Sequence, residues 1–144
     1  PTGFENDFGA AVVLHLIAET QVPYADQEKV PYCLVIGQQL QGATPAFMAR
    51  FNESGVEWVP TAGLDYDRVT KATVLKKTRT NPIVLQLKRI HQKDTTTYEF
   101  DAAWNRGGDL VQKRYEVIGE RDSGQPMQVT EVSLPTDSGK TNQS

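Results

Sequence analysis

The sequence predicts an α+β domain in which two helices pack on one face of a curved antiparallel β-meander of four to six strands. Three observations carry this prediction. From Pro82 to Val117, apolar and polar residues alternate with a period of two, as in strands with one buried face. Short turn-forming runs separate the alternating segments. An apolar stripe with helical spacing precedes the meander and supplies a cover for its buried face.

The first helix is expected over Glu5–Thr20, where apolar residues recur close to i, i+3 and i+4. Asn6 or Asp7 can cap its first turn through a short side-chain oxygen. Gly9 weakens the helix by about 1 kcal/mol relative to alanine. Pro23 is a natural stop.

A polar loop over Tyr24–Val30 is expected to lead into a buried strand at Pro31–Gly37. A second loop, Gln38–Gly42, is expected to connect this strand to the next helix. Thr44 followed by Pro45 predicts the start of that second helix, which extends to about Glu53.

Gly55 suits the left-handed conformation that ends a helix. Val56–Pro60 is predicted to be extended, and Thr61–Arg68 to be a loop. The meander then begins with a strand over Val69–Thr78. The turn at Arg79–Pro82 ends this strand, because proline opens a strand but rarely lies inside one.

Three further strands complete the predicted meander. They cover Pro82–His91, Thr96–Trp104 and Leu110–Ile118, with a glycine hairpin over Asn105–Asp109. A last strand is expected at Met127–Leu134. Residues 1–134 therefore form one predicted domain, and 135–144 a polar tail that we expect to be mobile.

The two faces of the meander differ in character. Tyr98, Phe100 and Trp104 share one face with Tyr115 of the following strand, and we expect this concave face to be a ligand or partner surface. The other face carries charges of opposite sign in neighbouring strands, which would contribute roughly 0.2–1 kcal/mol per pair. A solvated face with paired charges is the simpler interpretation; a ligand-facing surface is the alternative. The residues of that ligand-facing surface are Lys88, His91, Glu99, Asp101 and Lys113.

Composition limits the function classes. The chain has 144 residues and a formal net charge of −3, which argues against general nucleic-acid binding. Cationic residues are nevertheless enriched between Arg50 and Lys93, so an anionic protein partner is the better expectation. No apolar run approaches the roughly 20 residues of a membrane helix, so no membrane insertion is expected. One cysteine cannot form an internal disulfide, and the sequence is compatible with an exported, periplasmic or cytoplasmic location.

The order of these segments resembles a pattern found in uncharacterised bacterial proteins, many of them exported. The resemblance rests on Tyr32–Gly37, Thr44–Phe51 and Val56–Pro60 ahead of an antiparallel meander. It implies no known activity and no catalytic residues. More broadly, a helix followed by a curved sheet is similar to cystatin-like and nuclear-transport-factor-2-like folds, which host enzymes, binders and oligomerisation modules alike.

No catalytic or metal site is predicted. Cys33 could act as a nucleophile only beside a base such as His15, and its apolar neighbours favour a small buried hydrophobe instead. Two histidines and one cysteine, widely spaced, match no zinc pattern. Asp65-Tyr66-Asp67 lacks the glycine and glutamate of a calcium loop. We expect no cofactor.

The favoured function is a non-enzymatic binding or protein-interaction domain. Its surface is expected on the concave sheet or on Val56–Tyr66, where Trp58 is a candidate anchor; the alternative is that Trp58 closes the core beneath the second helix. A second hypothesis is a small-molecule-binding or enzymatic cone, with His15 or Asp101 as the polar group in an aromatic pocket. A third is a structural subunit that forms a homodimer through the sheet.

Overall fold

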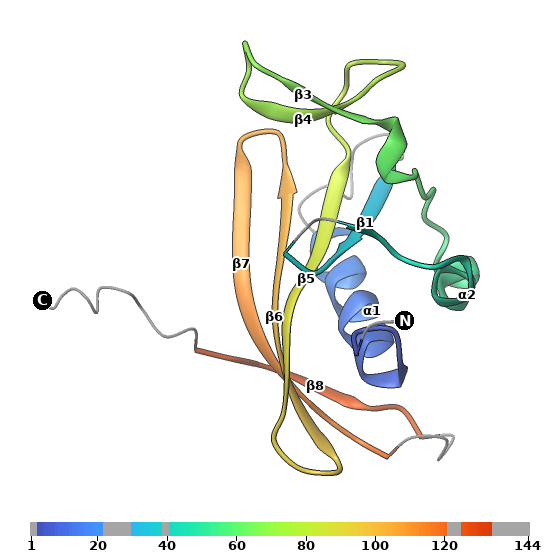
Figure 1. Ribbon diagram of the computed structural model, residues 1–144, viewed down its shortest axis with the longest axis vertical. Coiled ribbons are helices and arrows are strands. Elements are labelled where there is room, and N and C mark those ends of the chain that lie inside the picture. Colours follow the sequence, from blue (N-terminus) through green and yellow to red (C-terminus); the bar gives the residue numbers. More distant parts are fainter. Residues whose placement is uncertain (1–2, 22–29, 39–40, 121–124, 134–144) are drawn as a thin grey trace, which may run out of the picture.

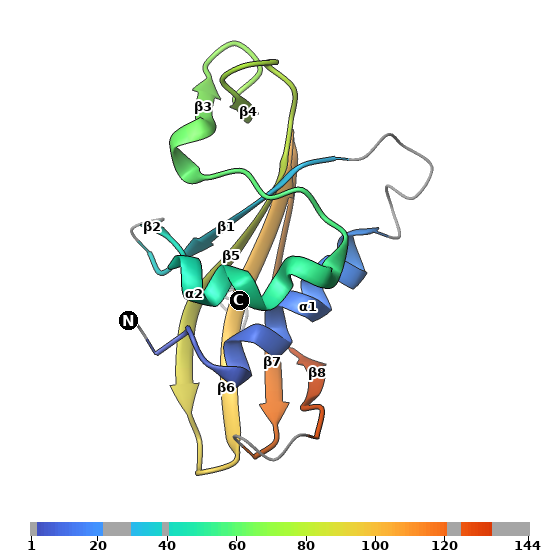
Figure 2. The same cartoon turned by 90° about the vertical axis from the view of Figure 1, so that its right-hand side faces the viewer.

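The computed structural model describes residues 3–21, 30–38, 41–120 and 125–133. One long helix, α1 (Asp7–Gln21), crosses a six-stranded sheet, and a separate two-stranded sheet projects from one end (Figure 1). A short helical segment lies beside α1 on the same side of the sheet (Figure 2). The predicted α+β class is therefore confirmed. The predicted loop at 24–30 and the predicted tail at 135–144 lie largely or wholly outside the described residues.

The main sheet has the order β2-β1-β5-β6-β7-β8. Every neighbouring pair is antiparallel except β1 and β5, which are parallel. The meander is thus antiparallel as predicted, whereas the sheet as a whole is mixed. The long connection between β1 and β5 returns the chain to the end where β1 began, as parallel pairing requires. The strands are β1 (Tyr32–Ile36), β2 (Gln41–Gly42), β5 (Ile83–Gln92), β6 (Thr97–Arg106), β7 (Asp109–Ile118) and β8 (Gln128–Val132).

Helix α1 begins at the predicted cap. The side-chain oxygen of Asn6 accepts hydrogen bonds from the backbone N–H groups of Phe8 and Gly9 at 2.9 and 3.0 Å. The structure explains why position 9 is glycine, because a Cβ atom there would lie 1.8 Å from the carbonyl oxygen of Phe4. This residue therefore permits a close approach of two backbone segments, beyond its cost to helix propensity.

The second helix is shorter than predicted. Thr44 caps α2 (Pro45–Met48) through a hydrogen bond from the Phe47 N–H, but the chain then tightens into a 3₁₀ helix, η1 (Ala49–Ser54). The Ser54 hydroxyl donates to the Phe51 carbonyl, a local bond that competes with regular helix. Gly55 follows with φ of 80°, as predicted for a helix end.

The predicted loop at 61–68 and strand at 69–78 are wrong in part. The chain forms a 3₁₀ turn, η2 (Thr61–Gly63), and a hairpin of β3 (Leu64–Asp67) and β4 (Ala72–Leu75). The Asp67 carboxylate accepts hydrogen bonds from the N–H groups of Val69 and Thr70. These bonds create a turn where the sequence pattern predicts the start of a strand.

The main core lies between α1 and the sheet. Phe8, Val12 and Leu16 of α1 are fully buried, as are Phe100 of β6 and Tyr115 of β7. A smaller cluster lies on the opposite face of the sheet, under the hairpin, and contains Cys33, Val35, Val84 and Leu64.

Candidate functional site

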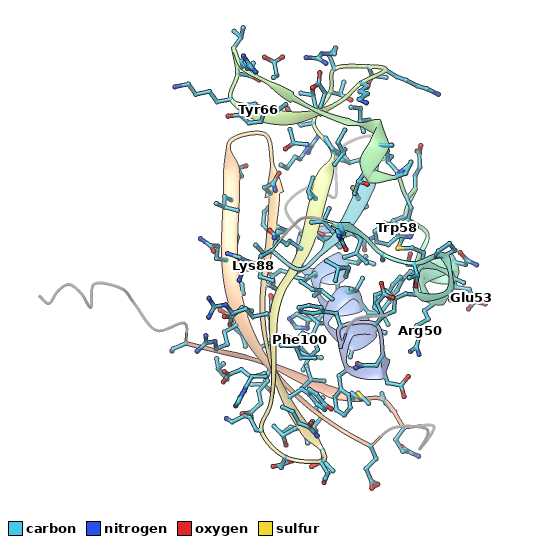
Figure 3. All side chains as sticks on the ribbon, viewed as in Figure 1. Arg50, Glu53, Trp58, Tyr66, Lys88 and Phe100 are labelled. Atoms are coloured by element: carbon cyan, nitrogen blue, oxygen red, sulfur yellow. The ribbon has the colours of Figure 1, made fainter. Side chains whose placement is uncertain are left out.

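The concave face of the sheet is occupied by α1. Tyr98, Phe100, Trp104 and Tyr115 all belong to the buried core, and the Phe8 ring lies 4.2 Å from that of Tyr98. Figure 3 shows Phe100 on the helix side of the sheet. These residues do not form an open surface, and their contact with a partner stays a prediction.

A carboxylate from α1 joins two of these aromatic side chains. Glu19 accepts a hydrogen bond from Nε1 of Trp104 at 3.2 Å and from the hydroxyl of Tyr115 at 2.8 Å. His15 lies one helical turn earlier, with Nε2 3.8 Å from Glu19 Oε1, and its ring centroid is 5.0 Å from that of Tyr115. The structure therefore brings together His15, Trp104 and Tyr115 around Glu19, a residue that the sequence analysis missed.

The contacts of Glu19 with Trp104 and Tyr115 fix α1 on the sheet. Burial, followed by the hydrogen bond to Glu19, raises the pKa of Tyr115 above its usual value, so the hydroxyl remains a donor. The distance between Glu19 and His15 is too long for a hydrogen bond. The i, i+4 spacing of His15 and Glu19 was the only sequence signal that could have pointed to this cluster around Glu19.

Asp101 lies on the other face of the sheet. Its two carboxylate oxygens accept hydrogen bonds from Nε and Nη2 of Arg114 at 2.6 and 3.0 Å, a bidentate pair between β6 and β7. Asp101 is therefore separated from His15 by the sheet, and the two do not share a pocket. The pair matches the prediction of a face with paired charges, but Lys113 does not belong to that face: it lies opposite Ala102 on the α1 side of the sheet and pairs with Glu131 at 2.9 Å.

Trp58 packs beneath η1. Its ring centroid lies 5.9 Å from Tyr32 and 5.9 Å from Phe51, as the interpretation of Trp58 as a core residue predicts (Figure 3). Within the described residues its Nε1 is inaccessible and has no hydrogen-bond partner. The half-buried indole also lines an apolar groove of about 550 Å³ with Met48 and Pro60.

Cys33 is a buried hydrophobe. It packs in the cluster on the face opposite α1, so it does not meet His15, and burial raises its pKa to about 11. A high thiol pKa disfavours the nucleophilic thiolate. The described ranges contain no group of three or more histidine, cysteine, aspartate or glutamate residues that could hold a metal ion.

The outward side of α1 is apolar. Ala11, Leu14 and Ala18 form a stripe along α1, in which Ala11 is half-buried against the core and Leu14 is 48% exposed. A groove of about 690 Å³ runs beside this stripe, between α1 and Met127 and Val129 next to and in β8, and Asp7, Arg50 and Glu120 also line it. A surface helix normally carries polar residues on its outer face, so the exposed apolar residues distinguish this α1–β8 face.

The α1–β8 face also includes a free sheet edge. In the described residues β8 pairs only with β7 (Figure 2). The N–H of Gly119 donates to the carbonyl of Thr96, so odd-numbered residues of β7 direct their backbone groups to β6 and even-numbered ones to β8. In β8 the backbone groups of Val129 and Glu131 therefore point to the open edge.

Comparisons with protein-family models, curated proteins and solved structures found no match to this chain. Among the described helices, none has the length and hydropathy needed to cross a membrane.

Proposed function

We propose that the protein is a non-enzymatic interaction module that pairs with a second copy of itself through the α1–β8 face. The observation that carries this proposal is the juxtaposition of exposed apolar residues on α1 with an edge of β8 that no other described strand pairs with. Each feature is costly when left in water: exposed apolar patches favour association, and an open edge is a template for another strand.

A second copy fits this face because β8 is self-complementary when antiparallel. Backbone groups that point outward must pair with one another, which allows a register in which Val129 of one copy lies opposite Glu131 of the other. This register places Thr130 opposite Thr130 on a twofold axis and pairs all five residues of the strand. No like charges then lie directly opposite, whereas a register centred on Glu131 would oppose two carboxylates.

The same twofold axis accounts for the stripe on α1. An axis normal to the joined sheets keeps both α1 helices on one side of the assembly. The two outer helix faces then border the same seam, where each Leu14 can cover the groove of the partner. Burying a leucine side chain stabilises the association by about 1.5–3 kcal/mol.

The enzymatic cone has less support. The space between α1 and the sheet is filled by large core side chains. Glu19, the polar group that enters this region, is already bonded to Trp104 and Tyr115. The interaction module therefore explains more of the exposed features of the chain.

Sedimentation velocity tests the proposal with three variants. Leu14→Asp places a charge in the seam, and Val129→Pro removes an outward N–H while sparing the pairing with β7. Both should convert a wild-type dimer into a monomer with an unchanged far-UV circular dichroism spectrum. Leu110→Asp is the matched control, because Leu110 is 62% exposed on β7 and should leave the dimer intact. A monomeric wild type, or a dimer that tolerates Leu14→Asp, would overturn the proposal.

A further inference from the structure

The projecting hairpin has a charge opposite to that of the rest of the chain. Residues 61–81, here called the β3–β4 arm, contain five lysine and arginine residues and two aspartates, a formal net charge of +3. The whole chain has −3, which leaves −6 for the remainder. Charge separation of this size creates a local positive potential on an acidic molecule.

The two aspartates of the arm are used internally. Nη1 of Arg79 lies 2.6 Å from Oδ2 of Asp65, and Nη2 lies 3.6 Å from Oδ2 of Asp67. The Asp65 carboxylate also accepts the N–H of Tyr66, and that of Asp67 accepts two turn N–H groups. Arg79 and these aspartates therefore brace the hairpin, and their combined charge of −1 leaves a net +3 from the four other cations of the arm.

Four cationic side chains of the arm face solvent. Arg68 and Lys71 lie in the turn between β3 and β4, and Lys76 and Lys77 follow β4. The charge of Lys76 contributes at longer range to lowering the pKa of Asp65. Within the described ranges, none of the four has a carboxylate within 4.0 Å. They are available to an anionic partner.

The arm also presents apolar contact area on a fixed scaffold. Val69 is 91% exposed in the turn and Tyr66 is 56% exposed on β3. Figure 3 labels Tyr66 in the projecting hairpin. The amide of Asn81 donates to the Thr73 carbonyl, and Leu64 packs on the cluster under the hairpin. Tyrosine and arginine are enriched at protein interfaces, and a contact surface that is already ordered loses less entropy on binding.

We propose that the β3–β4 arm is a docking surface for an acidic segment of a partner protein. The positive region is short, since each four-residue strand spans roughly 13 Å. A nucleic acid, with a charge every 1.7 Å or so along a duplex, would extend beyond the arm and meet the acidic remainder of the molecule. A short acidic segment with apolar residues matches both the cations and the exposed Tyr66 and Val69.

Fluorescence anisotropy with the full chain tests this surface. The probe is a labelled peptide of Glu-Glu-Leu repeats, and its comparison peptide carries glutamine in place of glutamate. The acidic peptide should bind, and its affinity should fall as salt is added. Lys76→Glu/Lys77→Glu and Arg68→Glu/Lys71→Glu should each weaken binding about tenfold. The matched control is Lys88→Glu/Arg89→Glu on β5, another adjacent cationic pair, and it should change affinity less than about twofold.

Other outcomes overturn the proposal. They are absence of binding, equal binding by the arm variants, or tighter arm-dependent binding of single-stranded DNA or of phosphatidylserine vesicles. Leu14→Asp separates this surface from self-association, because a monomeric variant should still bind the peptide with wild-type affinity. Loss of the dimer with retained peptide binding is the result that the two proposals together predict.

Discussion

The hydroxyl of Tyr115 in β7 donates a hydrogen bond to Oε1 of Glu19 in α1 at 2.8 Å. The second oxygen of the same carboxylate accepts the indole N–H of Trp104 in β6. One glutamate near the end of α1 thus ties the helix to two neighbouring strands. This contact fixes the orientation of α1, and with it the direction of the outward stripe that contains Leu14.

Removing that carboxylate should destabilise the fold. Glu19→Ala leaves the donors of Trp104 and Tyr115 without their acceptor, and we expect the free energy of unfolding to fall by about 2 kcal/mol. Urea denaturation followed by circular dichroism measures the change. Glu19→Gln, which keeps an acceptor oxygen, should lose less. If the urea midpoint of Glu19→Ala equals that of the wild type, the Glu19 contact does not stabilise the fold.

The thiol of Cys33 should be unreactive in the folded protein. It is buried, and its pKa is raised to about 11, so a thiol reagent at neutral pH should modify it only after unfolding. A raised folded-state pKa means that the native state holds its proton longer than the unfolded chain does. The contribution of Cys33 to stability is therefore complete below the unfolded-state pKa and is lost as pH rises toward 11.

A comparison of wild type and Cys33→Ala isolates this dependence. The difference between their unfolding free energies should shrink as pH increases through the alkaline range, independently of other titrating groups. Rapid labelling of the native wild type at neutral pH would show that Cys33 is accessible and would contradict its burial in the folded protein.

Gly9→Ala should destabilise α1 despite the higher helix propensity of alanine. The added Cβ would lie 1.8 Å from the carbonyl oxygen of Phe4, so the segment before the helix must move. We expect a loss of about 2 kcal/mol in thermal or urea unfolding. Gly108→Ala is the control, because nothing lies within 4 Å of its Cβ position. An increase in stability for Gly9→Ala would contradict the close approach of these segments.

Local signals in the sequence predicted local structure well. The caps at Asn6 and Thr44 and the left-handed Gly55 follow from the chemistry of single residues with their neighbours. The meander follows from alternation with a period of two. The parallel pairing of β1 with β5 could not be predicted in this way, because it depends on where a long connection returns.

The proposed surfaces depend on tertiary relationships. Spacing along α1 places Glu19 beside His15, but does not reveal that Trp104 and Tyr115 reach the same carboxylate. The strand β3 escaped prediction because Asp65 and Asp67 interrupt its apolar pattern, and Arg79, from a later turn, supplies their partner. Counting charges revealed the basic bias of this region but not which cations remain exposed.

The most direct test of the proposed assembly is disulfide formation at Thr130. In the Cys33→Ala background, Thr130→Cys places one thiol per chain on the twofold axis, in a pair whose Cα atoms lie about 4.5 Å apart, within the range that a disulfide requires. Mild oxidation should give a covalent dimer on a non-reducing gel. Gln128→Cys should not, because its two copies would be offset by four residues, about 13 Å. Failure of Thr130→Cys to cross-link, or equal cross-linking at both positions, would contradict pairing of β8 with β8 in this register.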